Sequence, residues 1–166
     1  KRSEFGVNTY VPLIGDEPFA VILGDDEPGR VIQKELQKNG VSLEYVMLDR
    51  KRGTNYSTVL NFQRERTILV YHEQRTYRLP KLASAFWVYL TSMGKGWERI
   101  LPALHRYLDR AGARLAFNPG THQIRSGRTV LKPLLARASC LMVNREEAAT
   151  ILGTKPSVQL VRLLRG

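Results

Sequence analysis

The sequence predicts an α/β domain with a mainly parallel sheet, helices on both faces and one β-hairpin. Two observations support this class. Short apolar runs typical of buried strands alternate with segments of helical periodicity, as in chains that build parallel sheets with right-handed crossovers. Two β-rich stretches, 54–62 and 67–71, are separated only by a short polar turn and predict the hairpin. At 166 residues the chain can form one core, so we expect a single domain over residues 1–166.

The first half of the chain contains one predicted strand and helix before the hairpin. Residues 19–23 are apolar and β-prone, which indicates a buried strand. An acidic turn follows at 24–29, where two adjacent aspartates either cap a helix or bind a cation, and we favour the cap. The helix is expected over about 28–39, with Gly40 ending it, and residues 41–43 begin an extended link.

The second half alternates strands and helices more regularly. Residues 85–90 predict a central strand, and 97–111 a helix with an apolar stripe in which Pro102 delays or kinks the start. The remaining elements, in chain order, are a strand at 114–117, a helix at 129–138, a strand at 140–143, a helix from 144 to Gly153 and an amphipathic helix over 158–164.

The composition of the chain indicates which kinds of partner it can bind. The net charge of +11 is compatible with nucleic-acid binding, but the basic residues are dispersed and no nucleic-acid motif accompanies them, so we expect solvated basic faces that attract anionic nucleotides. No apolar run approaches the ~20 residues that span a bilayer. With no signal-peptide pattern at its start, the chain is expected in the cytoplasm. The single cysteine, Cys140, is predicted to be a buried structural thiol.

Common catalytic signatures are missing from the sequence. The three histidines have no metal-ligand spacing. The sequence also contains no phosphate-binding P-loop, no dinucleotide-binding glycine fingerprint and no nucleophile elbow. A site must therefore be sought at the ends of the predicted strands.

Residues 139–153 are the strongest candidate for such a site. A short apolar run ends at Asn144, and the following helix carries Glu147 in its first turn. Asn followed three residues later by Glu is a capping-box pattern. A helix start at the carboxyl end of a parallel strand is also a place where anions bind. A helix cap and a phosphate site are compatible, because both need polar groups at this position.

Four segments together resemble the ribokinase-like (PfkB-type) carbohydrate kinases. They are the Asn-x-x-Glu segment at 144–147, the Gly24-Asp25-Asp26 turn that runs to Gly29, the hairpin region and the Asn118-Pro119 that follows a strand. They occur in the family's order and cover most of the chain. The resemblance implies a partial ribokinase-like three-layer fold, with the hairpin, over residues 52–78, inserted as a lid.

The resemblance also implies site residues, cofactors and partners. Asn144 and Glu147 would bind the ATP cofactor, with Glu147 also ordering Mg²⁺ and its waters. Asn8 and the lid residues Tyr56 and Tyr71 would contact the sugar or nucleoside. The segment around Asn8 is either a degraded or truncated copy of the family's sugar-binding segment or a plain loop. Phosphoryl transfer needs this charge neutralisation together with a base beside the acceptor hydroxyl.

The sequence departs from the family at the base. It contains no Gly-Ala-Gly-Asp segment, which in the family supplies the base and an anion hole, and it lacks the family's first strand. We therefore expect an internal portion of a sugar kinase, with no catalytic residue of its own and little activity alone. The alternatives are a non-catalytic sugar- or nucleotide-binding remnant, a homodimer through the lid and, less favoured, a basic nucleic-acid-binding domain.

Overall fold

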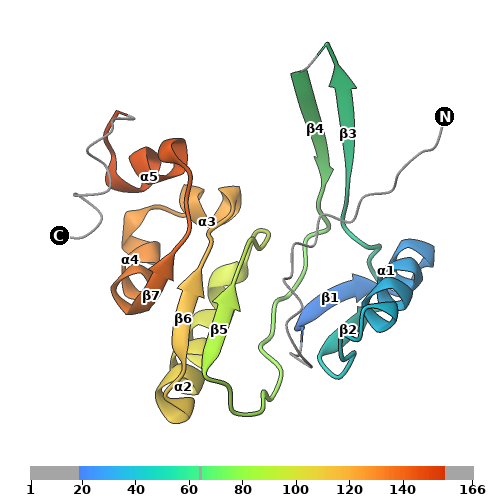
Figure 1. The fold of residues 1–166 in the computed structure, drawn as a ribbon, viewed down its shortest axis with the longest axis horizontal. Coiled ribbons are helices and arrows are strands. Elements are labelled where there is room, and N and C mark those ends of the chain that lie inside the picture. Colours follow the sequence, from blue (N-terminus) through green and yellow to red (C-terminus); the bar gives the residue numbers. More distant parts are fainter. Residues whose placement is uncertain (1–18, 64, 156–166) are drawn as a thin grey trace. The chain divides into compact units, whose positions relative to one another are not determined.

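The computed structural model describes residues 19–63 and 65–155, except the side chain of Arg66. Predictions for Asn8 and for a helix over 158–164 lie outside these residues. The chain divides into two compact units, the first running to Glu73 and the second starting at Gln74. Both have the α/β character predicted from the sequence (Figure 1).

The first unit begins with a β–α–β arrangement. β1 (Val21–Gly24) and β2 (Val46–Asp49) pair in parallel from Val21↔Val46 to Gly24↔Asp49, and α1 (Glu27–Lys38) connects them. Among the described residues of this unit, the buried apolar side chains are Leu23, Leu36, Val41 and Tyr45. Asp26 caps α1 and Pro28 occupies its first turn, where the missing amide costs nothing. The helix prediction is confirmed.

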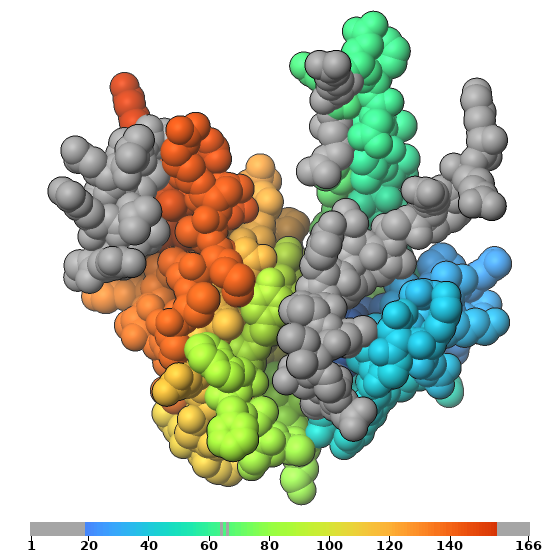
Figure 2. Space-filling model, viewed as in Figure 1, coloured from blue at the N-terminus to red at the C-terminus, as the bar shows by residue number. Residues whose placement is uncertain are grey.

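The predicted hairpin is also confirmed. β3 (Tyr56–Phe62) and β4 (Glu65–Tyr71) are antiparallel, with Tyr56 opposite Tyr71 and Phe62 opposite Glu65. Every residue of β3 is exposed, so both faces of the ribbon meet solvent. Figure 2 shows this ribbon, in green, as a narrow projection.

The second unit is a three-stranded parallel sheet, in the order β5-β6-β7, with its helices. Its elements are β5 (Trp87–Leu90), η1 (Trp97–Ile100), α2 (Leu101–Ala111), β6 (Arg114–Phe117), α3 (Thr121–Arg125), α4 (Arg128–Arg137), β7 (Ala138–Leu141) and α5 (Arg145–Leu152). Leu115 and Phe117, alternate residues of β6, are almost fully buried with Leu104, Leu108 and Leu131 in one core.

Some local predictions need correction. Residues 46–49 form a strand and 121–125 a short helix, neither of which was predicted. The last strand begins at Ala138 rather than Cys140, and Cys140 is exposed. The buried-thiol prediction was wrong: Ser139 and Cys140, neighbours whose side chains lie on opposite faces of β7, are both exposed, and among the described residues β7 pairs only with β6. No helix among the described residues is long and apolar enough to cross a bilayer.

Candidate functional site

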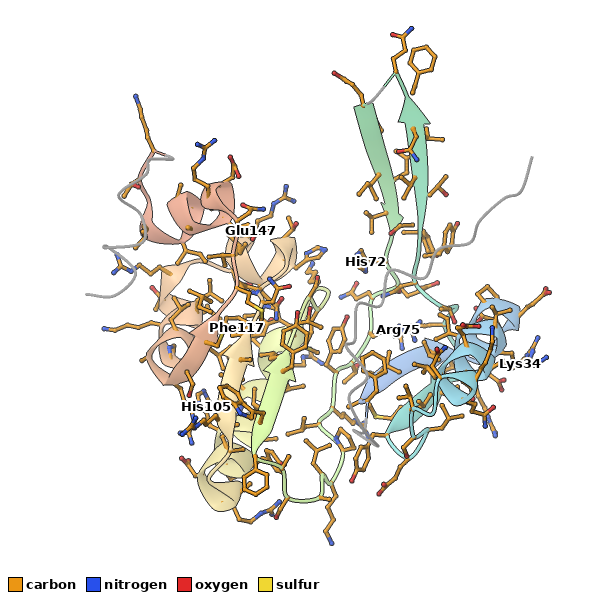
Figure 3. All side chains as sticks on the ribbon, in the orientation of Figure 1. Lys34, His72, Arg75, His105, Phe117 and Glu147 are labelled. Carbon is orange, nitrogen blue, oxygen red and sulfur yellow. The ribbon has the colours of Figure 1, made fainter. Side chains whose placement is uncertain are left out.

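The carboxyl ends of β5, β6 and β7 lie at one edge of the sheet because the three strands are parallel. The segments that leave this edge are residues 91–94, 118–120 and 142–144. Figure 3 shows Glu147 on α5, beyond the end of the strand that carries Phe117. In open α/β sheets ligands bind at this edge, so its polar side chains are the first candidates.

Asn144 and Glu147 form the predicted capping box at the start of α5. The Glu147 amide donates to Asn144 Oδ1 at 2.8 Å, and the Asn144 amide donates to Glu147 Oε2 at 2.9 Å. The cap is therefore confirmed, and it holds both side chains at the helix start. Glu147 Oε1 lies outside this reciprocal pair.

Asn118 ties the ends of all three strands together. Its amide nitrogen Nδ2 donates to the Met142 carbonyl after β7 at 2.6 Å, and its backbone N–H donates to the carbonyl of Leu90 in β5 at 2.9 Å. The Tyr89 hydroxyl donates to Asn118 Oδ1 at 3.3 Å. Asn118 therefore holds the strand ends in register, a positioning role that the sequence did not predict.

A buried glutamine organises the other two segments. Gln123 is fully buried, and its Oε1 accepts from the Gly120 amide at 2.6 Å and from the Met93 amide at 3.3 Å, while Nε2 donates to the Thr91 carbonyl at 3.2 Å. Sequence reasoning missed this residue. Its position three residues after Gly120 was the available signal, because a Gln at the third helical position can reach back to accept from the N-cap amide.

Tyr56 and Tyr71, the predicted substrate residues on the lid, are brought together by the hairpin register. Their rings stack with centroids 5.1 Å apart, and both are about half exposed. The Tyr71 hydroxyl donates to Glu73 Oε1 at 2.9 Å, and this hydrogen bond to a carboxylate raises the pKa of Tyr71. The pair forms an aromatic surface at the base of the hairpin.

Asp26 joins the turn after β1 to the start of the hairpin. Its carboxylate accepts from the Gly29 amide at 2.9 Å, the Thr54 amide at 2.7 Å and the Thr54 hydroxyl at 2.6 Å. The Thr54 hydroxyl bond is the main cause of a lowered Asp26 pKa, and the two amide bonds add to it. A Cβ at Gly24 would lie 2.5 Å from the Thr54 nitrogen, so the contact requires glycine there. This supports the favoured helix-cap interpretation of the turn.

The described residues contain no group of three or more acidic, histidine or cysteine side chains able to enclose a metal ion. Magnesium does not require such a cage, because it often binds through one or two carboxylates, several waters and substrate phosphates. Glu147, with one oxygen outside the cap, fits that mode of binding. Asp26 fits it less well, because its carboxylate already accepts three hydrogen bonds.

The family model described as pfkB family carbohydrate kinase matches residues 13–164. No sequence among curated proteins matches the chain significantly. Solved structures with the same fold include a fructokinase from Vibrio cholerae O395 with fructose, ADP and calcium ion bound, at 15% identity and TM-score 0.70, covering 91% of this chain and 54% of that one.

Two further solved structures are similar. One is aminoimidazole riboside kinase from Salmonella enterica, complexed with aminoimidazole riboside and an ATP analogue, at 23% identity and TM-score 0.65, covering 92% of this chain and 55% of that one. The other is 2-dehydro-3-deoxygluconokinase from Thermotoga maritima, at 17% identity and TM-score 0.66. This match covers 87% of the present chain and 50% of the kinase. At these identities the likeness concerns the fold, which is ribokinase-like, and the chain spans about half the length of these proteins.

Proposed function

Because the chain belongs to the pfkB family of carbohydrate kinases, we propose that it is part of a kinase that transfers a phosphoryl group from ATP to a carbohydrate or nucleoside hydroxyl. The observation that carries the proposal is the Asn144–Glu147 pair at the carboxyl edge of a parallel sheet. The fructokinase and the riboside kinase with this fold were solved with a nucleotide or its analogue, which supports the same class of ligand here.

The start of α5 would bind the phosphate side of the nucleotide. The capping box satisfies the amides of Asn144 and Glu147, whereas those of Arg145 and Glu146 lie in the same first turn outside that pair. Amides at a helix start, together with the helix dipole, favour phosphate groups. The Glu147 carboxylate would repel a bare phosphate, so a cation between them is part of the proposal.

Glu147, through Oε1 or through water, would hold that cation, which we propose is Mg²⁺. When bound, the ion neutralises charge on the phosphates. Asn144 would keep the Glu147 carboxylate in place through the cap. Asn118, one strand away, would fix the segment from which both project.

The hairpin would act as a lid over the acceptor. Tyr56 and Tyr71 present an aromatic face suited to the apolar surface of a sugar or nucleoside ring, and we propose that they contact it together with Asn8. A closed lid excludes water, which otherwise competes with the acceptor hydroxyl. We propose no catalytic base among these residues, so the chain alone should bind ligands with little turnover.

Isothermal titration calorimetry with ATP and Mg²⁺ tests the nucleotide site. We expect Glu147→Gln to weaken binding roughly tenfold or more, because the cap is retained by glutamine while the charge is lost. Glu146→Gln is the matched control, since this neighbouring carboxylate is exposed and pairs with the exposed Arg145 at 3.4 Å. Equal effects of the two variants, or no binding by the unaltered chain, would reject the assignment. A coupled assay over a sugar panel separates binding from turnover.

A second proposal, a homodimer through the lid, is supported by the alternation of side chains along the hairpin. Val59 faces Ile68 across the strands and shares one side of the ribbon with Val70, whereas Tyr56 and Tyr71 lie on the other. All three aliphatic side chains are about half exposed. Burying them against a second copy would leave the tyrosine side available to the acceptor.

Sedimentation velocity tests the dimer. Val59→Lys should shift the chain to monomer, whereas the control Leu60→Lys, on the tyrosine side, should not. A monomeric unaltered chain at high concentration would rule out this arrangement.

A further inference from the structure

A pocket of about 250 Å³ lies in the second unit, between residues 79–82 and α2. Its helix wall consists of Ala103, Arg106, Tyr107 and Arg110, whose spacing places them on one face of α2. The opposite wall is mainly apolar, from leucine and proline side chains, with Lys81 among them. The pocket is an open surface depression that combines apolar walls with three solvent-exposed cations, Lys81, Arg106 and Arg110.

The pocket is held by internal contacts. Tyr107 is 5% exposed, and its hydroxyl donates to the Ala83 carbonyl at 2.7 Å, which ties the segment after residue 82 to the helix. The Arg110 guanidinium lies 5.9 Å from the centre of the Tyr107 ring, within the range of a cation–π contact. A ligand would thus meet walls that are already in place.

The charge of the pocket is uncompensated. No carboxylate lines it, and within the described ranges none of Lys81, Arg106 and Arg110 takes part in an ion pair. The acidic residue nearest in sequence to Arg110, Asp109, pairs instead with Arg137 at 2.6 Å. Guanidinium groups bind phosphate oxygens through paired, charge-assisted hydrogen bonds, so the missing counter-charge favours an anionic ligand.

The pocket and the proposed nucleotide site lie at opposite ends of the sheet. α2 returns from the carboxyl end of β5 to the amino end of β6, and Arg106 and Arg110 lie in its second half. Asn144 and Glu147 follow the carboxyl end of β7. A ligand in the pocket is therefore a second ligand and takes no part in phosphoryl transfer.

We propose that this pocket binds a small phosphorylated organic anion of the sugar-phosphate class. The cations hold the phosphate, and the apolar walls with Ala103 cover the carbon body. The volume lies just below the ~300–1,000 Å³ of pockets for drug-sized ligands, which favours a sugar phosphate over a nucleoside triphosphate.

Calorimetry with glucose 6-phosphate, inorganic phosphate and glucose tests the proposal on the whole chain. We expect glucose 6-phosphate to bind most tightly and glucose not to bind. Arg106→Gln with Arg110→Gln should weaken binding at least tenfold, since each removes charge-assisted bonds. The control Lys132→Gln, an exposed cation on α4 outside the pocket, should leave it unchanged.

A second variant separates shape from charge and covers the case in which the double variant does not fold. Ala103→Leu keeps all three cations but fills the pocket, so it should weaken glucose 6-phosphate binding more than phosphate binding. Equal weakening of the two ligands, or an effect of Lys132→Gln as large as that of the arginine variants, would overturn the proposal.

Competition identifies where the ligand binds. Loss of glucose 6-phosphate binding in Glu147→Gln, or displacement by ATP with Mg²⁺, would place the ligand at the proposed nucleotide site and overturn the pocket. Binding of RNA oligonucleotides in place of the sugar phosphate would also overturn it. Failure of the kinase proposal leaves this test unaffected, because the readout is binding at a separate site.

Discussion

Replacing Asp26 with alanine should destabilise the first unit more than any other single change to its acidic turn. The carboxylate accepts three hydrogen bonds that join the start of α1 to Thr54 at the start of the hairpin segment. Alanine removes all three and leaves the Thr54 amide without this acceptor. The change therefore tests whether the turn and the hairpin base form one structural element.

The magnitude follows from these contacts. Loss of an N-cap costs about 1 kcal/mol, and hydrogen bonds to a charged group contribute about 1.5–3 kcal/mol each. Because the three bonds share one carboxylate they are not additive, so we expect the free energy of unfolding to fall by about 2–4 kcal/mol. Asp25→Ala is the matched control: its contacts with Arg30 and Arg50 are long, at 4.0 and 3.8 Å, and exposed, so its removal should cost less than about 1 kcal/mol.

The pH dependence gives an independent check. The pKa of Asp26 is lower in the folded state than in the unfolded chain. Its contribution to the free energy of unfolding is therefore fully present above the pKa that Asp26 has in the unfolded chain, and it is lost as the pH falls through the pKa that Asp26 has in the folded state. The difference in the free energy of unfolding between the unaltered chain and Asp26→Ala should therefore become smaller at acidic pH. Asp26→Asn keeps a neutral helix cap, so near neutral pH its free energy of unfolding should lie between those of the unaltered chain and Asp26→Ala.

Urea unfolding followed by far-UV circular dichroism measures the free energies, and hydrogen exchange at the amides of Gly29 and Thr54 reports the local effect. Faster exchange at both amides in Asp26→Ala, but not in Asp25→Ala, is the expected result. If Asp26→Ala costs no more than Asp25→Ala, the reasoning is refuted.

Three further changes test the second unit and the hairpin. Gln123→Ala should lower the free energy of unfolding by about 2–4 kcal/mol, because buried donors and acceptors lose their partner. Urea unfolding followed by tryptophan fluorescence, to which the fully buried Trp97 contributes, measures it, and a loss below about 1 kcal/mol would contradict it. Gly120→Ala should lower the melting temperature, because its Cβ would overlap the Ser92 side chain, and an unchanged temperature would refute this close approach. The phenol pKa of Tyr71 should lie above its ordinary range and return toward it in Glu73→Gln, which removes the negative charge, as measured by NMR titration of the Tyr71 ring; no change in the variant would contradict the Glu73 carboxylate as the cause.

Local patterns predicted much of the fold. The β-rich runs around a polar turn gave the hairpin, and the Asn144 cap with Gly153 at the other end of α5 gave that helix its limits. Both depend on residues a few positions apart in sequence, where propensity and capping act directly. The positions of Asn144 and Glu147 at a strand end followed from the same local signals.

Long-range contacts account for what the sequence did not predict. β2 is only four residues long and is defined by its pairing with β1, which no local pattern encodes. The Asp26–Thr54 contact spans 28 positions, and that between Gln123 and Thr91 spans 32. The exposure of Cys140 likewise depends on whether another element covers β7. Such features depend on tertiary packing rather than on periodicity.

The most direct test of the nucleotide site is an amide NMR titration of the chain with ATP and Mg²⁺. We predict that the largest shift changes occur at Arg145, Glu146 and Glu147 in the first turn of α5, and that they are lost in Glu147→Gln. Changes confined to other parts of the chain, with the α5 amides unmoved at saturation, would contradict the proposed nucleotide site.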